Sequence, residues 1–216
     1  MKAARIALQQ DSAAPLIPDG ATIDELRGVA AGCTACPLWA GARQTVFGEG
    51  PETARLVLVG EQPGDEEDLA GRPFVGPAGR LLRRALADAG IDEGAVYVTN
   101  AVKHFKWVAK GKKRIHSKPS GREIRACKPW LDAELEALEA EVIVALGATA
   151  AQALLGPSFK ITQHLGEVLP FERESVVVPA LHPSAVLRSP DEEARRANYG
   201  GLVRALQVAA STAASP

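Results

Sequence analysis

Residues 55–65 read RLVLVGEQPGD, a short apolar run that ends in a glycine-rich polar turn. The run is continuous rather than alternating, which is typical of a strand buried on both faces of a parallel sheet. Three further runs have the same character: VYVTN at 96–100, EVIVAL at 141–146 and SVVVPAL at 175–181. We therefore expect four buried, parallel strands.

Helical patterns follow or separate these runs, at 77–89, 121–140, 148–155 and 191–209. Strands that alternate with helices predict a parallel sheet covered on both faces. The expected fold is therefore an α/β protein, a three-layer α/β/α sandwich with a central four-stranded parallel sheet. The small, polar residues 209–216 predict a flexible tail.

Composition sets broad limits on the class of protein. With 216 residues, 46% hydrophobic and 24% charged, the chain suits one globular domain and not a disordered, collagen-like or coiled-coil protein. No run approaches the ~18 apolar residues of a membrane span, and no secretory signal is evident. We expect a cytoplasmic monomer with no membrane partner. In a reducing compartment, the pair Cys33 and Cys36 suggests metal or redox chemistry.

The charge is nearly balanced overall but is unevenly distributed. Lys and Arg number 25 against 26 acids, yet residues 103–128 hold ten basic residues and one acid. This basic segment carries +9 and the remainder of the chain −10. Such asymmetry indicates a polyanion partner, with a solvated lysine-rich loop as the alternative.

Polar residues lie at the carboxyl ends of three predicted strands: Glu61 and Gln62, Asn100, and His182. In open parallel sheets, ligands bind outside the carboxyl ends of the strands. We therefore expect these side chains to converge at one edge of the sheet, although they are far apart in sequence.

Four motifs carry a resemblance: GEQPGDEEDLAGRPFVGPAGRLL (60–82), VTNAVKHFKW (98–107), KKRIHSKPS (112–120) and HPSAVLR (182–188). They resemble the uracil-DNA glycosylase superfamily and are most similar to its UdgX branch, a relative of the iron-sulfur family 4 enzymes. The resemblance implies a single domain at 24–208, preceded by an N-terminal extension at 1–23. It also implies a [4Fe-4S] cluster and cleavage of the N-glycosidic bond of deoxyuridine in DNA.

For the base, the resemblance places Phe74 under the ring and Asn100 on its edge. Gln62 and the backbone amides of Gly60 and Gly64 would support the ring. A side-chain amide suits uracil because it offers a donor to O4 and an acceptor to N3–H. The alternatives are ordinary core packing for Phe74 and a strand-ending turn for Asn100.

For the chemistry, the resemblance implies a donor beside the base and a carboxylate beside the sugar cation. His182 is expected to donate to O2 of the leaving uracil. Glu61 would stabilise the cation or orient a water, with Asp65 as the second candidate. His116, in the Arg-Ile-His loop, would bond covalently to C1′. A surface histidine is the alternative.

The expected metal ligands are Cys33, Cys36, Cys127 and His104. Family 4 enzymes have a cysteine where this chain has His104. Thiolates select zinc or iron-sulfur clusters, so the residues alone leave the metal open, and the resemblance implies [4Fe-4S]. The alternative for His104 is a surface or phosphate-contacting histidine.

DNA contacts are expected from Lys112, Lys113, Arg114 and Ser184, with Arg114 either gripping DNA or holding its loop. The expected partner is uracil-containing DNA, preferably single-stranded. Two rival hypotheses remain: a glycosylase that turns over without covalent capture, and a metal-stapled, non-catalytic DNA-binding module.

Overall fold

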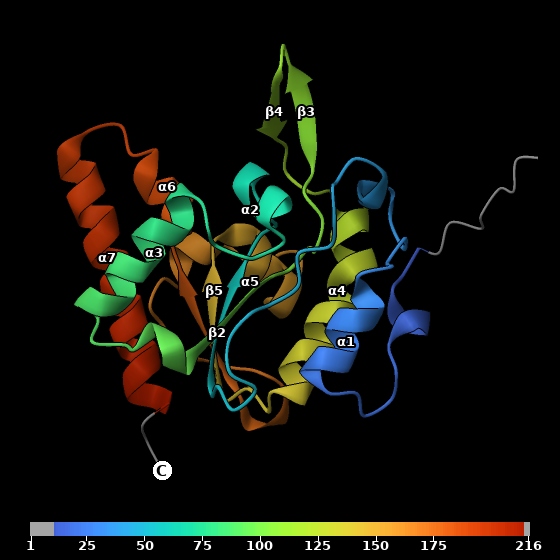
Figure 1. Ribbon diagram of the computed structural model, residues 1–216. Coiled ribbons are helices and arrows are strands. Elements are labelled where there is room, and N and C mark those ends of the chain that lie inside the picture. The colour runs from blue at the N-terminus through green and yellow to red at the C-terminus, as the bar shows by residue number, and fades with distance from the viewer. Residues whose placement is uncertain (1–10, 214–216) are drawn as a thin grey trace, which may run out of the picture.

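The computed structural model describes residues 11–213 and has helices on both sides of a central sheet (Figure 1). The sheet order is β2-β1-β5-β7-β6. Its first four strands are parallel neighbours, namely β2 (Val96–Asn100), β1 (Leu56–Gly60), β5 (Val142–Leu146) and β7 (Val176–Ala180). The predicted fold class is confirmed. The predicted strand number is wrong by one, because the two-residue β6 (Leu169–Pro170) pairs antiparallel with β7.

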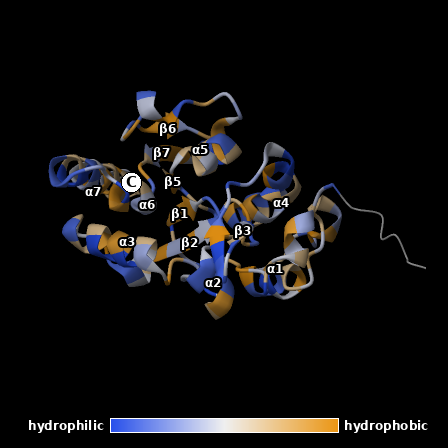
Figure 2. Cartoon of the chain, turned by 90° about the horizontal axis from the view of Figure 1, so that it is seen from above, coloured by the Kyte–Doolittle hydropathy of each residue, from blue (hydrophilic) through white to orange (hydrophobic). Residues whose placement is uncertain are grey.

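The two faces of the sheet bury two separate apolar clusters. Val57 and Val59 of β1 face α1 (Ile23–Ala30), α4 (Gly121–Ala137) and α5 (Ala148–Leu155). Leu56 and Leu58 face the other helices. These are α3 (Pro77–Asp88), α6 (Pro183–Leu187) and α7 (Glu192–Ala213). Successive side chains of a strand point to opposite faces, so a strand covered on both sides is apolar throughout. Seen from above in Figure 2, the two groups of helices flank the strands.

Short elements connect the layers. Helix α2 (Asp65–Ala70) follows β1 directly and had no counterpart among the predicted helices. Five 3₁₀ turns complete the fold: η1 (Ala14–Leu16), η2 (Pro37–Ala40), η3 (Glu93–Ala95), η4 (Ile161–Gln163) and η5 (Glu172–Glu174). No helix within residues 11–213 is long and apolar enough to cross a membrane.

The ends of the chain differ from the predicted boundaries. Helix α7 continues to Ala213 and Ala209 is fully buried, so the predicted flexible tail is wrong for 209–213. Residues 214–216 lie outside the described residues, as do 1–10 of the predicted extension. The described part of that extension packs on the domain: Ala13 is buried and its N–H donates to the Ala126 carbonyl at 2.8 Å.

A β-hairpin was missed in the basic segment. Strands β3 (Trp107–Lys110) and β4 (Lys113–His116) pair antiparallel and join through Gly111, whose φ of 61° suits a tight turn. The hairpin projects from the body above the carboxyl ends of the strands (Figure 1). Its sequence lacks the apolar alternation that would have predicted strands.

Candidate active site

A cavity of about 780 Å³ lies at the carboxyl edge of the sheet. The structure brings together there the residues that follow β1, β2, β5 and β7, together with the end of the hairpin. Nine of the predicted site residues line it: Glu61, Gln62, Gly64, Asp65, Phe74, Asn100, His116, His182 and Ser184.

Glu61 and His116 meet at this cavity. The Nε2 atom of His116 lies 3.1 Å from Oε1 of Glu61, and the Thr149 hydroxyl donates to Oε2. Burial alone would raise the pKa of Glu61, but the hydrogen bonds from His116 and Thr149 outweigh it and hold this pKa below its usual value. The sequence did not predict a contact between Thr149 and Glu61. Its role depends on α5 starting beside Glu61.

His182 is held in one tautomer. Its Nδ1 accepts the backbone N–H of Ser184 at 3.1 Å and lies 2.8 Å from the Ser184 hydroxyl. Burial lowers the pKa of His182 to about 4, so the ring is neutral at pH 7 and its proton is on Nε2. His182 is therefore a neutral donor. Ser184, for which a DNA contact remains a prediction, orients His182.

Phe74 and Asn100 form a narrow slot. The rings of Phe74 and His182 are stacked, with centroids 6.2 Å apart. A Cβ on Gly60 would lie 2.4 Å from Asn100 Oδ1 and 2.7 Å from Phe74 Cζ, so this position requires glycine. Within the described residues, the Asn100 side-chain amide has no hydrogen-bond partner; Asn100 is only 3% exposed and lines the cavity. A buried amide in a narrow slot is suited to a planar polar ligand.

Two of the groups predicted to support the ring have hydrogen-bond partners within the protein. The Gln62 amide donates to the carbonyls of Lys106 and Ser117 at 3.1 and 3.2 Å, and its oxygen accepts the Lys106 N–H at 3.2 Å. Both ends of this amide therefore tie together the base of the hairpin. The Gly64 N–H donates to Glu67 at 3.0 Å and is likewise committed.

Arg114 holds the hairpin in place. Its guanidinium pairs with Asp65 at 2.6 Å and with the buried Asp68, both on α2, and lies over the rings of Phe105 and Trp107. Of the two roles considered for Arg114, the structure favours loop positioning. Because the Asp65 carboxylate is paired with Arg114, Glu61 is the better placed carboxylate. Lys112 and Lys113 are exposed at the hairpin tip.

The three cysteines are buried in one apolar cluster, and His104 is buried as well. Trp130 Nε1–H donates to Cys33 Sγ at 3.3 Å, and the Lys103 N–H donates to Cys127 Sγ at 3.2 Å. Burial raises the pKa of Cys127 to about 12, so a thiolate here needs a nearby positive charge. Among residues 11–213, no three His, Cys, Asp or Glu side chains converge as a single metal ion would require.

The tautomer of His104 suits a metal ligand. The Thr45 hydroxyl donates to the Ala30 carbonyl at 2.8 Å, so at 3.0 Å it accepts the proton of His104 Nε2. The Nδ1 lone pair is then left buried and without a partner among residues 11–213. Burial lowers the pKa of His104 to about 4, which keeps that lone pair unprotonated. A buried, unpaired imidazole nitrogen matches the chemistry of a fourth ligand beside thiolates.

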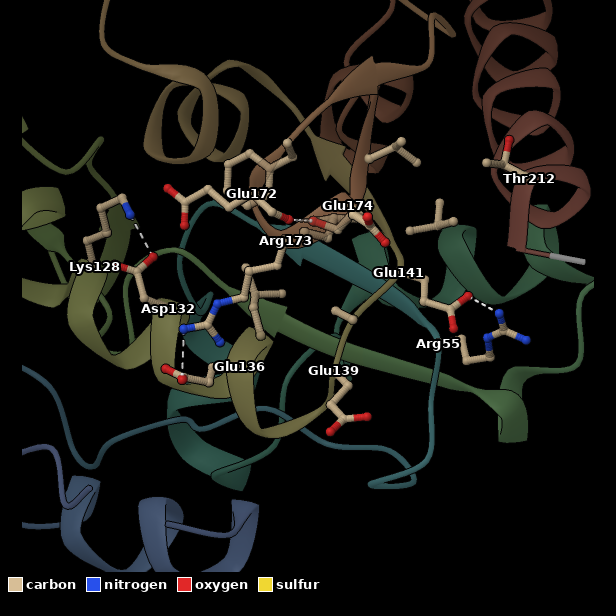
Figure 3. A pocket seen from close by; sticks show the side chains of 17 residues that line it. Arg55, Lys128, Asp132, Glu136, Glu139, Glu141, Glu172, Arg173, Glu174 and Thr212 are labelled. Atoms are coloured by element: carbon tan, nitrogen blue, oxygen red, sulfur yellow. Dashed lines mark hydrogen bonds and ion pairs between the residues drawn. The ribbon is translucent and has the colours of Figure 1, made fainter. Parts of the chain in front are cut away.

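A second cavity, of about 920 Å³, lies at the amino ends of the strands and is larger than the first. Figure 3 shows that charged side chains surround it, in the ion pairs Arg55–Glu141, Lys128–Asp132 and Arg173–Glu136. It contains none of the predicted site residues, so size alone does not identify the functional cavity.

Comparison with known proteins identifies the family to which the chain belongs. The family model described as Uracil DNA glycosylase superfamily matches residues 47–207. A type-4 uracil-DNA glycosylase of Thermotoga maritima is 41% identical over 165 residues, covering 76% of this chain and 82% of that protein. One of Archaeoglobus fulgidus is 36% identical, covering 78% and 85%. A type-5 enzyme of Thermus thermophilus is 37% identical, covering 55% and 56%. The chain belongs to the uracil-DNA glycosylase superfamily.

Proposed function

We propose that this protein is a uracil-DNA glycosylase of the UdgX kind, which excises uracil from DNA and then bonds through His116 to C1′ of the resulting sugar. The observation that carries the proposal is the position of His116. The hairpin is fixed at its base by Gln62 and at its side by Arg114, and it sets the imidazole 3.1 Å from Glu61 at the cavity. A histidine with no role would need no such support.

Excision follows from the groups that line the slot. The target nucleotide leaves the stack and its base lies against Phe74, with the Asn100 amide on the O4 and N3–H edge. The His182 Nε2–H donates to O2 as negative charge develops on the base. The ionised Glu61 stabilises the positive sugar.

Capture is then a substitution at C1′. The C1′–N1 bond breaks and its electron pair leaves with uracil. His116 Nε2 bonds to C1′ as Glu61, its hydrogen-bond partner, takes the Nε2 proton. That proton passes to the uracil anion or to solvent. Water attack in place of imidazole would give a free abasic site.

We further propose that Cys33, Cys36, Cys127 and His104 hold a [4Fe-4S] cluster. The buried thiols and the His104 Nδ1, which has no partner among the described residues, support it. The cluster would join the loop that holds Cys33 and Cys36 to α4. Glycosidic cleavage transfers no electron, so its role would be structural.

We also propose a preferred DNA substrate, an oligomeric state and a cellular compartment. Single-stranded uracil DNA is the preferred substrate because no base pair must be broken before the base enters the slot. We propose a monomer in the cytoplasm, where the three cysteines, none of which forms a disulfide, remain reduced.

The direct test is to mix the protein with a single-stranded oligonucleotide containing one uracil and run a denaturing gel. A slow band that survives heat and detergent is the expected result. Oligonucleotide with a free abasic site and no slow band would instead show a glycosylase that turns over. Unchanged DNA would contradict both enzyme proposals and leave a DNA-binding module.

The pH dependence of excision should reflect His182 and Glu61. Both have a lowered pKa, about 4 for His182, so each stays in its working form from pH 8 downward. Single-turnover excision should therefore lose little activity from these groups until about pH 5 and fall as the pH approaches 4. A loss centred between pH 6 and 7 that is absent in His182→Ala would show that His182 is protonated there and refute the neutral-donor role.

The salt dependence of DNA binding should show how many cations of the basic segment contact phosphates. Five of its ten cations are paired with acids, namely Lys103, Lys106, Arg114, Arg122 and Lys128. The other five have no ion-pair partner among the described residues. If all five contact phosphates, log Kd should rise with log salt with a slope of about 3.5 on single strands. The triple variant Lys110→Ala, Lys112→Ala, Lys113→Ala should reduce that slope by about 2. An unchanged slope would place the phosphate contacts elsewhere.

A further inference from the structure

A fully buried ion pair, Lys103 with Glu134, lies behind the carboxyl end of β2. Lys103 is in the loop after β2, Glu134 is on α4, and both are 0% exposed. Lysine and glutamate are almost never buried completely unless they are paired. Neither residue takes part in the chemistry proposed above, so the pair needs a separate explanation.

The Lys103 ammonium has a partner for each of its three protons. It donates to the Asn100 carbonyl at 2.8 Å and to the Thr99 hydroxyl at 2.7 Å, and it pairs with the Glu134 carboxylate. A lysine with three acceptors in fixed directions is held in one position. It therefore ties the last two residues of β2 to α4.

Both carboxylate oxygens of Glu134 also accept hydrogen bonds. Its Oε1 accepts the Tyr97 hydroxyl at 2.9 Å and the Gly48 N–H at 3.0 Å, and its Oε2 accepts the Thr99 hydroxyl at 2.9 Å. A buried ion pair is weak evidence of stability, because apolar residues of similar volume often serve as well or better. This pair supplies hydrogen bonds of fixed direction to β2, which an apolar pair would not supply.

Those bonds matter because they act on the backbone of Asn100, whereas its side-chain amide is not itself held by hydrogen bonds from the described residues. Within the described residues no protein group hydrogen-bonds its amide, so its orientation follows from the backbone that carries it. That backbone is held by Lys103 at the Asn100 carbonyl and by the next N–H, of Ala101, which donates to Gly60 at 2.9 Å. We propose that Lys103, with Glu134, is a positioning residue that aligns Asn100 and so determines selectivity for uracil, an inference that rests on the proposed function.

Lys103 also connects this alignment to the cysteines. Its backbone N–H donates to Cys127 Sγ, and the next residue is His104. A shift of Cys127 would therefore change the position of Lys103, and with it the position of the Asn100 backbone.

The test is Lys103→Met, which keeps the length of the side chain and removes its donors. Excision of uracil should fall about 100-fold, since misplacement by about 1 Å costs that much. Affinity for DNA that already contains an abasic site should stay unchanged. The double variant Lys103→Met, Glu134→Gln leaves no unpaired charge, so it should regain thermal stability and still excise poorly. The control is Lys128→Met, which removes an exposed ion pair on the same helix and should leave activity unchanged.

A second measurement does not depend on the substrate. Hydrogen exchange at the Ala101 amide should accelerate by about tenfold in the double variant, whereas exchange at Val144 in β5 should not change. Wild-type rates of excision in a folded double variant, or unchanged exchange at Ala101, would overturn the positioning role. An inactive wild type would refute the proposed function instead, and exchange at Ala101 would still decide whether Lys103 holds β2.

Discussion

Replacing His116 by alanine is expected to abolish the covalent band on a denaturing gel while uracil is still released. The variant lacks the imidazole that contacts Glu61 at the cavity. Water then takes the place of Nε2 at C1′, and the product is a free abasic site. Excision itself should stay within about tenfold of wild type, because His182 and Glu61 remain and the loss of a general acid or base typically costs about 100-fold or more.

The matched control is His164→Ala. His164 also pairs with a glutamate, Glu167, at 2.8 Å, but it does not line the cavity. It should capture DNA as wild type does. A persistent covalent band in His116→Ala would assign the adduct to another nucleophile, and loss of excision together with capture would show that His116 belongs to the cleavage step.

The second large effect is expected from Cys127→Ala. Cys127 is buried on α4, and its thiolate would be one of four ligands of the proposed cluster. Wild-type protein should be brown and contain about four irons per chain. The variant should lose most of its iron and its broad visible absorbance, and its thermal stability should fall because α4 is no longer joined to the loop of Cys33 and Cys36.

Two comparisons make this experiment specific. His104→Ala should also lower the iron content, whereas His164→Ala should not, because only His104 has a buried Nδ1 without a partner among the described residues. A colourless wild-type protein with stoichiometric zinc would contradict the cluster. Full iron content in Cys127→Ala would remove Cys127 from the ligand set.

The strands and their common edge could be predicted from the sequence. A strand covered on both faces must be apolar at every position, and β1, β2, β5 and β7 are nearly so. Once the strands are parallel, the residues that follow them must meet at one edge, as Glu61, Asn100 and His182 do. These inferences depend only on the apolar character of each run and on the residues that follow it. They can therefore be made without knowing which distant residues are in contact.

The hairpin could not be predicted in this way. Its sequence, WVAKGKKRIH, is lysine-rich, and its strands are stabilised by contacts with distant residues: Gln62 at the base, Asp65 and Asp68 beside Arg114, and the Gly41 carbonyl, which accepts Trp107 Nε1–H at 2.8 Å. The same contacts show that Gln62 supports the hairpin, which could not be predicted from the sequence. Local propensity is a weak guide where distant polar groups determine the backbone.

By itself, the sequence determined the α/β class, the edge of the sheet that carries the cavity and the residues proposed as ligands and nucleophile. Only the tertiary structure decided which groups are free to act. Among the ten cations of the basic segment, it buries Lys103 against Glu134 and pairs Arg114 with α2, while Lys112 and Lys113 stay exposed. It also fixes the tautomers of His104 and His182 through Thr45 and Ser184. The physical reason is that charge and protonation depend on burial and on hydrogen-bond partners, and those partners are remote in the chain.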